Sequence, residues 1–384
     1  MIDRLLAPKI LDLAKKFPII SLTGPRQSGK TTLLKNLLPN YRYVSLENPT
    51  TRAFAREDPT GFLKTYDQLV IFDEVQRVPE LFSYLQTKVD EDQIMGQYVL
   101  SGSQNFLLLQ NITQSLAGRV AILKLLPLSY AELSKATLLS ESIAYHIFTG
   151  NYPAIFGRNL LSDEFYSNYI ETYVQRDVRE LLAVKELSSF QTFLRLCAGR
   201  VGQPLNLSSL ATDCGITSPT AKAWLSILES SYITFTLQPH YQNFNKRLIK
   251  SPKLYFYDTG LLCHLLNMTD AHQVETYYQR GSLFENAIIA EMSKNRFNRG
   301  LSPQFYFWQD SNRNEIDLLE EGAGTINLFE MKYSATINSE YFKNLRLYRE
   351  LSSTGGDNFL IYAGEESQIR SNAKVIPWNQ VINL

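Results

Sequence analysis

The feature that most constrains this chain is a glycine-containing loop that lies between an apolar segment and a helix-like one. Residues 24–31 read Gly-Pro-Arg-Gln-Ser-Gly-Lys-Thr and match G-x-x-x-x-G-K-[ST] at every fixed position. The pattern predicts a strand at 18–22, before the loop, and a helix at 30–38, after it. In that context, backbone N–H groups and the start of the helix form a cradle for phosphate. The alternative is a chance glycine-rich turn.

Individual positions of this loop have distinct expected roles. Lys30 would bridge the β- and γ-phosphates of ATP, and the Thr31 hydroxyl would bind Mg²⁺. We therefore expect ATP and Mg²⁺ as ligands of a site formed by Gly24, Pro25, Arg26, Gln27, Ser28, Gly29, Lys30, Thr31, Thr32 and Asp73.

A second motif, at 69–74, supports the first. Four apolar residues (Leu-Val-Ile-Phe) are followed by Asp73 and Glu74, as at the carboxyl end of a buried central strand. Asp73 would hold Mg²⁺ through water, and Glu74 would orient and deprotonate the attacking water. An acidic pair after a strand is usually a solvated turn, but its occurrence downstream of the glycine loop favours a catalytic role.

Two further positions are expected to refine the site. Ser103 follows the strand expected at 98–100, beside the γ-phosphate. Arg119 directly precedes the strand expected at 120–125, where it would reach the nucleotide of a neighbouring subunit and stabilise transition-state charge. For Arg119 the alternative is a surface salt bridge or a contact with a helix C-terminus. The first interpretation implies a homo-oligomer.

At this point the chain resembles a known family. The segments GPRQSGKTTLL, FDEVQRVPEL, SGSQNFLL, SLAGR, YVQRDVREL and FEMKYS are similar to those of prokaryotic AAA+-type ATPases whose C-terminal domain, of unknown function, is related to PD-(D/E)xK nucleases. The resemblance implies an α/β fold: a P-loop AAA+-like parallel sheet, a helical and winged-helix unit, and a small α/β nuclease-like domain. The expected boundaries are an ATPase core at 1–135, a helical connector at 136–200, a winged-helix-like lid at 201–262 and the nuclease-like domain at 263–384.

Carboxylates and a lysine in the last third suggest a second site. Asp317 is expected on one strand, and Glu330 and Lys332 on one face of the next, so that a hairpin would bring all three together. Glu285 on a preceding helix would add a third acid. Such a cluster would hold Mg²⁺ for phosphodiester cleavage, with Lys332 helping to position or deprotonate the water. The alternative is an exposed, solvated strand face.

Residues 240–260 form a candidate nucleic-acid contact, because they contain Lys246, Arg247, Lys250 and Lys253 followed by aromatic residues. They follow a helix-turn-helix pattern at 205–230, with 233–237 and 254–257 as a candidate wing. The alternative is a lid over the ATP site. DNA or RNA could also bind the C-terminal domain.

The composition sets limits on these expectations. Lys plus Arg and Asp plus Glu both total 38, which argues against a surface that is positive throughout. The sequence has no apolar run of the roughly 20 residues that a membrane span needs and no signal-peptide pattern, so a cytoplasmic protein is expected. Two functions remain open: an ATPase that controls a nuclease-like domain acting on nucleic acid, or a nucleotide-dependent regulatory switch whose C-terminal domain binds a partner without cleavage.

Overall fold

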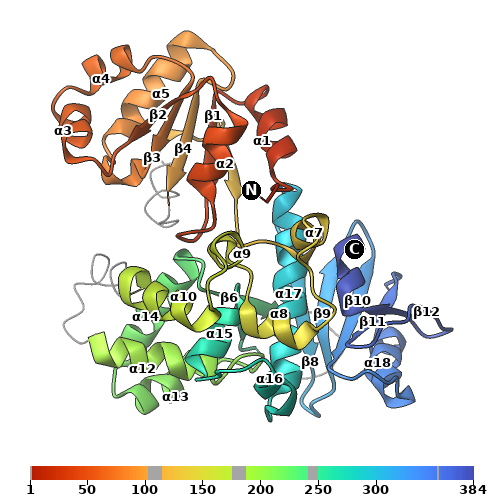
Figure 1. Ribbon diagram of the computed structural model, residues 1–384. Helices are drawn as coiled ribbons and strands as arrows, with labels where there is room; N and C mark the ends of the chain where they lie inside the picture. Colours follow the sequence, from red (N-terminus) through yellow and green to blue (C-terminus); the bar gives the residue numbers. More distant parts are fainter. Residues whose placement is uncertain (1, 103–114, 175–186, 241–249, 353) are drawn as a thin grey trace. The chain divides into compact units, whose positions relative to one another are not determined.

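The computed structural model describes residues 2–102, 115–174, 187–240, 250–352 and 354–384. The chain divides into two compact units. Unit 1 comprises Met1–Leu128, Ser230–Tyr232 and Arg296–Leu301, and unit 2 comprises the remainder. Each unit contains its own sheet (Figure 1), so the α/β fold class expected from the sequence is confirmed.

Unit 1 is built on a five-stranded sheet in the order β2-β3-β4-β1-β5. All four strand pairings are parallel. The strands are β1 (Ile19–Thr23), β2 (Arg42–Ser45), β3 (Val70–Asp73), β4 (Tyr98–Gly102) and β5 (Val120–Lys124). The strands β1, β3, β4 and β5 therefore occur where the apolar segments predicted them. β1 lies between β4 and β5, so the loop that follows Thr23 leaves the carboxyl edge of the sheet at an internal strand.

Helices cover both faces of this sheet because its internal strands are apolar on both sides. One face packs against α3 (Pro49–Glu57), α4 (Pro59–Thr65) and α5 (Leu81–Asp92), and the other against α1 (Ala7–Ala14) and α2 (Lys30–Leu37). Phe72 of β3 points into the first core and its neighbour Ile71 into the second. This alternation buries the strand completely and leaves Asp73 at its end.

The first part of unit 2 is helical. It contains α7 (Tyr130–Lys135), α8 (Ile143–Thr149), α9 (Pro153–Arg158), α10 (Ser162–Tyr169), a π-helical turn (Ile170–Val174) and α12 (Leu187–Ala198). The helix-turn-helix pattern is confirmed as α13 (Leu207–Cys214) and α14 (Ser218–Ser230). Gly215 ends α13 with φ +69°, a left-handed conformation that glycine adopts without strain.

An eight-stranded sheet forms the remainder of unit 2, in the order β12-β13-β11-β10-β9-β8-β6-β7. Its strands are β6 (Thr234–Pro239), β7 (Lys253–Phe256), β8 (Phe305–Gln309), β9 (Glu315–Glu321), β10 (Ile326–Lys332), β11 (Asn358–Tyr362), β12 (Gln368–Ile369) and β13 (Lys374–Pro377). The pair expected as a wing, β6 and β7, is joined to this sheet because Gln238 and Pro239 pair in parallel with Tyr306 and Phe307. The sheet thus crosses the boundary expected at 262/263.

Helices of unit 2 complete its cores. The 3-10 turn Ser339–Phe342 and α18 (Lys343–Leu351) pack on strands β8–β11 and β13. α15 (Thr259–Leu265), α16 (His272–Thr276) and α17 (Arg280–Asn298) connect β7 to β8, and a 3-10 turn at Trp378–Asn383 ends the chain. Every residue of α17 from Leu283 to Asn295 is buried, including the polar ones. This part of the helix is therefore enclosed on all sides by other elements.

Candidate functional sites

The loop of residues 24–31 joins β1 to α2 in a conformation that depends on its glycines. Gly24 has φ +153°, and a Cβ there would lie 2.1 Å from Leu125 O. Gly29 has φ +94° and precedes the first turn of α2. Lys30 is buried, and its Nζ donates hydrogen bonds of 2.8 Å to the carbonyl oxygens of Gly24 and Pro25. The lysine is therefore folded against its own loop.

The other loop positions differ in exposure. Ser28 is fully buried, and its Oγ has no hydrogen-bond partner within the described ranges of the chain. Gln27 and Thr32 are exposed and Arg26 is half-buried. An orphaned buried hydroxyl in a loop of this shape is consistent with a polar ligand.

An arginine near the N-terminus supports this loop, and the sequence motifs did not reveal it. The Arg4 guanidinium donates hydrogen bonds of 2.6 Å to Ser28 O and to Leu126 O. It thereby links the loop to the segment that follows β5. Local sequence gives no sign of this role because the contacts span 24 and 122 residues.

Asp73 is held by side chains from three neighbouring elements. Its Oδ2 accepts hydrogen bonds from Tyr43 Oη at 2.5 Å and from Thr31 Oγ1 at 3.3 Å. Its Oδ1 accepts one from Ser101 Oγ. The parallel register accounts for the contact with Ser101, which lies opposite Asp73 on β4, whereas Tyr43 reaches Asp73 from two residues before its partner on β2, Ser45. The carboxylate and the Thr31 hydroxyl are oxygen donors of the kind Mg²⁺ prefers, so they fit this ion.

Glu74 has an uncommon backbone conformation. Its φ of +54° is in the left-handed region, which non-glycine residues seldom adopt and which often occurs at functional positions. Gln76 Nε2 donates a 2.5 Å hydrogen bond to Glu74 Oε2. This bond fixes where the carboxylate points at the edge of the sheet.

The two further positions expected at the nucleotide site, Ser103 and Arg119, differ in whether the structure describes them. Ser103 lies outside the described residues. Arg119 precedes β5, whose first residue pairs with Ile19, so Arg119 lies at the edge of the sheet opposite the phosphate loop. Its Nε and Nη2 donate to both oxygens of Asp90, at 2.5 and 2.8 Å. In this structure it makes the surface ion pair that was the alternative, and a role toward a neighbouring subunit stays a prediction.

In unit 2, the hairpin of β9 and β10 brings the expected acidic residues together. Phe329 pairs with Leu318, which sets Glu330 beside Asp317, and Asp317 Oδ2 accepts a 2.7 Å hydrogen bond from Met331 N. Lys332 Nζ lies 2.6 Å from Glu330 Oε1 and 3.7 Å from Asp317 Oδ2. Since Asp317 and Glu330 are both more than nine-tenths buried, the solvated-strand alternative does not describe them.

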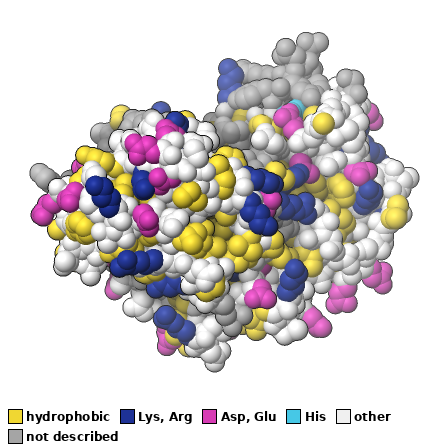
Figure 2. Space-filling view, turned by 90° about the horizontal axis from the view of Figure 1, so that it is seen from above, with side chains coloured by type: hydrophobic (Ala, Val, Ile, Leu, Met, Phe, Trp, Pro, Cys, Tyr) yellow, Lys and Arg dark blue, Asp and Glu magenta, His cyan; other side chains and the backbone are white. Residues whose placement is uncertain are grey.

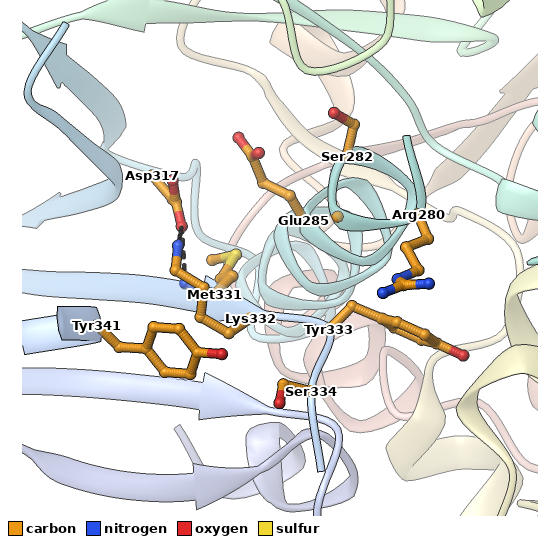
Figure 3. Close-up of a pocket in the computed structure, with 10 residues that line it drawn as sticks. Arg280, Ser282, Glu285, Asp317, Met331, Lys332, Tyr333, Ser334 and Tyr341 are labelled. Atoms are coloured by element: carbon orange, nitrogen blue, oxygen red, sulfur yellow. Dashed lines mark hydrogen bonds and ion pairs between the residues drawn. The ribbon is translucent and has the colours of Figure 1, made fainter. Parts of the chain in front are cut away.

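Glu285 completes the group from another element. It rises from the first turns of α17 and lines, together with Asp317 and Lys332, a pocket of about 350 Å³ (Figure 3). Glu285, Glu315 and Asp317 offer carboxylate oxygens that all lie within 4.8 Å of one another. Glu330 Oε2 is buried and has no hydrogen-bond partner among the described residues. The clustered carboxylates of Glu285, Glu315 and Asp317, together with the orphaned oxygen of Glu330, are ligands of the kind that a hard divalent cation such as Mg²⁺ or Mn²⁺ prefers.

Three residues of this site were not found from the sequence: Glu315, Tyr255 and Lys253. Lys253 was expected on a solvent-facing wing, and that expectation was wrong. Its side chain is 1% exposed, and Nζ lies 3.1 Å from Glu285 Oε1 and 2.5 Å from Glu315 Oε1. Tyr255 Oη donates a 2.5 Å hydrogen bond to Glu285 Oε1. Strand β7 presents both side chains to the acids because they are two residues apart.

Burial and crowding change the proton affinities of this group. Burial raises the pKa of the Glu330 carboxyl to about 8, and the neighbouring Asp317 charge adds to the rise. Burial raises the pKa of Glu285 to about 7 against the opposing effect of Lys253. For Lys253 itself burial lowers the pKa, but the carboxylates of Glu285 and Glu315 outweigh burial and raise it overall. Without a cation the ionised acids repel one another. A bound metal ion would offset this repulsion and favour the ionised carboxylates.

The remaining basic residues of the candidate nucleic-acid contact are few. Residues 241–249, with Lys246 and Arg247, lie outside the described part of the chain. Lys250 is exposed and lines, with Lys222 and Glu229, a pocket of about 890 Å³ beside the helix-turn-helix. On the face in Figure 2, Lys and Arg side chains lie among Asp and Glu side chains. That face therefore does not present a continuous positive surface.

None of the helices in the described part of the chain combines the length and apolar character that crossing a membrane requires.

Solved structures that match parts of this chain include an ATPase and a protein solved with AMPPCP. The Walker-type ATPase PABY2304 of Pyrococcus abyssi is 14% identical, with a TM-score of 0.46, and the match covers 69% of this chain and 96% of that one. AMPPCP-bound DnaA from Aquifex aeolicus is 13% identical, with a TM-score of 0.31, and the match covers 59% of this chain and 86% of that one.

Sequence comparisons cover most of the chain. Residues 16–134 match an AAA domain, residues 140–272 a domain of unknown function (DUF8612) and residues 280–381 a domain of unknown function (DUF4143). The uncharacterized protein Rv2008c of Mycobacterium tuberculosis is 30% identical over 324 residues, which are 83% of this chain and 71% of that protein. An uncharacterized protein of Haemophilus influenzae is 22% identical, and the match covers 84% of each chain. The AAA domain indicates nucleotide binding and hydrolysis. The chain therefore carries an AAA ATPase domain at residues 16–134 and belongs to the same family as Rv2008c.

Proposed function

We propose that this protein hydrolyses ATP at the loop of residues 24–31 and that the nucleotide state controls a metal-dependent phosphodiester-cleaving site in unit 2, which acts on nucleic acid. The cleavage site is supported above all by Glu330 Oε2, a buried carboxylate oxygen beside Asp317 and Lys332 that has no partner in the part of the chain that the structure describes. A buried, unpaired carboxylate oxygen costs free energy unless a ligand binds it.

In the nucleotide site each residue has a separate task. Lys30 would leave the carbonyl oxygens of Gly24 and Pro25 to bind the phosphates. Thr31 and Asp73 would hold Mg²⁺, which neutralises phosphate charge when bound. Glu74, oriented by Gln76, would accept the proton of the attacking water. Arg119 would leave Asp90 and reach the nucleotide of a neighbouring subunit. This role requires the protein to act as a homo-oligomer.

In unit 2, Glu285 and Asp317, whose carboxylate oxygens lie within 4.8 Å of each other, would hold the cation together with the buried Oε2 of Glu330. The cation would supply Lewis-acid stabilisation of a phosphate oxygen. Lys332, bound to both Asp317 and Glu330, would orient the water that attacks phosphorus. Arg280 lines the same pocket from the start of α17 and would bind a neighbouring phosphate. Lys250 and the segment 241–249 would provide further contacts to the phosphate backbone of the nucleic acid.

The nucleotide half is tested with two variants. Lys30→Ala should lose ATP binding, whereas Glu74→Gln should bind ATP and hydrolyse it poorly, because only the proton acceptor is removed. Binding is measured with a fluorescent ATP analogue and hydrolysis by phosphate release. Undiminished turnover in both variants would contradict the assignment.

The cleavage half is tested with labelled single- and double-stranded DNA and RNA in the presence of Mg²⁺ or Mn²⁺. Asp317→Ala and Glu330→Gln should abolish cleavage, whereas Glu340→Gln, an exposed acid elsewhere in unit 2, should not. Cleavage that continues unchanged in both site variants would have another origin.

A second function is favoured by the burial of Lys253, which removes a positive charge from the surface expected to bind nucleic acid. In that case the C-terminal part binds a partner without cleavage and the protein is a nucleotide-dependent regulatory switch. It would show ATP hydrolysis that depends on Glu74, together with no cleavage of any of the four substrates.

A further inference from the structure

We propose that the Lys253 ammonium takes the place of a second metal ion, so that the site in unit 2 binds a single divalent cation. The inference rests on the proposed function and specifies it, because carboxylate clusters that cleave phosphodiesters can hold one or two ions.

Lys253 occupies the interior of the acidic group. Its side chain is 1% exposed, and Nζ lies between Glu285 Oε1 and Glu315 Oε1, at 3.1 and 2.5 Å. The Phe307 ring lies on another side, with its centroid 5.3 Å from Nζ. A buried ammonium in contact with two carboxylates is held by their combined charge, and it cannot move to solvent without leaving both uncompensated.

Glu315 is consequently not available to a metal, although its distances to the other acids would allow it. Its Oε1 accepts from Lys253 and its Oε2 accepts a 2.5 Å hydrogen bond from Gln309 Nε2. Both oxygens are therefore occupied by donors from the protein. Glu315 serves to hold Lys253 in position and does not bind the cation.

Each of the other three acids keeps one oxygen that accepts no hydrogen bond from the described residues. Glu285 binds Lys253 and Tyr255 through Oε1 and keeps Oε2. Asp317 binds Met331 N through Oδ2 and keeps Oδ1. Glu330 binds Lys332 through Oε1 and keeps Oε2, which is the orphaned oxygen. The carboxylate oxygens of Glu285 and Asp317 come within 4.8 Å of each other. With the oxygen that Glu330 keeps, and with water at the remaining positions, they are a suitable ligand set for one Mg²⁺ or Mn²⁺.

The charges of the site also indicate that it binds one divalent cation. Four carboxylates, from Glu285, Glu315, Asp317 and Glu330, carry four negative charges when ionised, and Lys253 and Lys332 carry two positive ones. The remaining two negative charges are neutralised by one divalent cation. A second ion would leave a buried excess of two positive charges, which a low-dielectric interior opposes strongly.

The test is to count Mn²⁺ ions by electron paramagnetic resonance and by titration calorimetry, in the full nucleotide-free chain. Asp73→Ala is introduced into every sample so that the ATP site does not contribute. We expect one tightly bound ion, weakened at least about tenfold by Glu330→Gln. Lys253→Met, of similar length and without charge, should admit a second ion that is magnetically coupled to the first. Glu315→Gln should keep one ion.

Two ions in the parent chain, or one ion in a folded Lys253→Met chain, would overturn the assignment of Lys253 and leave the proposed cleavage site standing. If Lys253→Met does not fold by circular dichroism, the parent and Glu315→Gln counts decide, because a site that uses Glu315 as a ligand would lose an ion in that variant. No Mn²⁺ bound by the parent chain would overturn the proposed function as well.

Discussion

The hydroxyl of Tyr43 donates a 2.5 Å hydrogen bond to Oδ2 of Asp73, the carboxylate at the end of β3. Burial and this bond raise the pKa of Tyr43, so the phenol keeps its proton at physiological pH. Lys35 Nζ lies 3.6 Å from the centroid of the same ring and restricts it further. The hydroxyl thereby fixes the orientation of the carboxylate that we expect to hold Mg²⁺.

Tyr43→Phe should therefore raise the Mg²⁺ concentration needed for half-maximal ATP hydrolysis by about tenfold, because a ligand that loses its orienting partner binds metal less well. Nucleotide binding measured in EDTA should be unaffected. Tyr41→Phe is the matched control, since its hydroxyl donates to Gly96 O, away from Asp73. An equal Mg²⁺ dependence in the Tyr43 variant and the parent would rule out this role.

Arg4→Ala should weaken ATP binding several-fold and destabilise unit 1 by about 1–3 kcal/mol, because the carbonyl oxygens of Ser28 and Leu126 each lose a charged donor. Calorimetric titration with an ATP analogue and thermal unfolding measure the two effects. Lys16→Ala is the control, because that side chain is 59% exposed and contacts only Asp12 among the ion pairs of the described residues. A variant of Arg4 that matches the control in both measurements would contradict the prediction.

Arg119→Ala and Asp90→Ala separate the two interpretations of Arg119. If the guanidinium leaves Asp90 for the nucleotide of a neighbouring subunit, Arg119→Ala should lower ATP hydrolysis on the order of 10³-fold, whereas Asp90→Ala should leave it unchanged. Hydrolysis is measured over a range of protein concentrations, together with the size of the protein in solution. We expect this asymmetry. Matching small effects from both variants would restrict Arg119 to its surface ion pair.

The stability of unit 2 should fall as the pH decreases from about 6.5 to about 4 because of His146. Burial lowers the pKa of His146 to about 4, against 6.5 for an ordinary histidine. Between these values the unfolded chain binds the proton and the folded chain does not, so acid favours unfolding. The full effect is about 3 kcal/mol, present above pH 6.5 and lost toward pH 4.

The matched variant is His146→Gln, which does not titrate and can still accept the hydrogen bond from Ser140 N. Thermal or urea unfolding of both chains from pH 4 to pH 8 should give curves that converge as the pH falls, with the parent showing the steeper loss. Parallel curves would show that His146 does not contribute to the acid sensitivity.

The parts of the structure that follow from local pattern could be predicted. Strand β3 was predictable because four apolar residues precede Asp73, and the hairpin of β9 and β10 because a glycine-containing turn separates its acids. The parallel pairing of β6 with β8 was not, since it depends on two residue pairs between distant segments. Lys253 was misjudged for a related reason: a lysine near other basic residues resembles a surface lysine, and only the fold reveals the acids that surround it. Arg4 was missed because its partners lie 24 and 122 residues away in sequence. Glu315 could have been found, because it lies two residues before Asp317 and therefore on the same face of β9.

The place of β7 in the second sheet also limits how this protein can be divided into modules. The segment that matches DUF4143 begins at residue 280, yet the lysine that compensates its acids is at 253 and the strands that cover the edge of β8 precede it. An isolated segment from 280 onward would expose unpaired backbone groups along that edge and leave Glu285 and Glu315 to repel each other. Recombination or truncation at that border should therefore give an insoluble product. The segment that matches DUF4143 is shorter than the segment that must fold together with it.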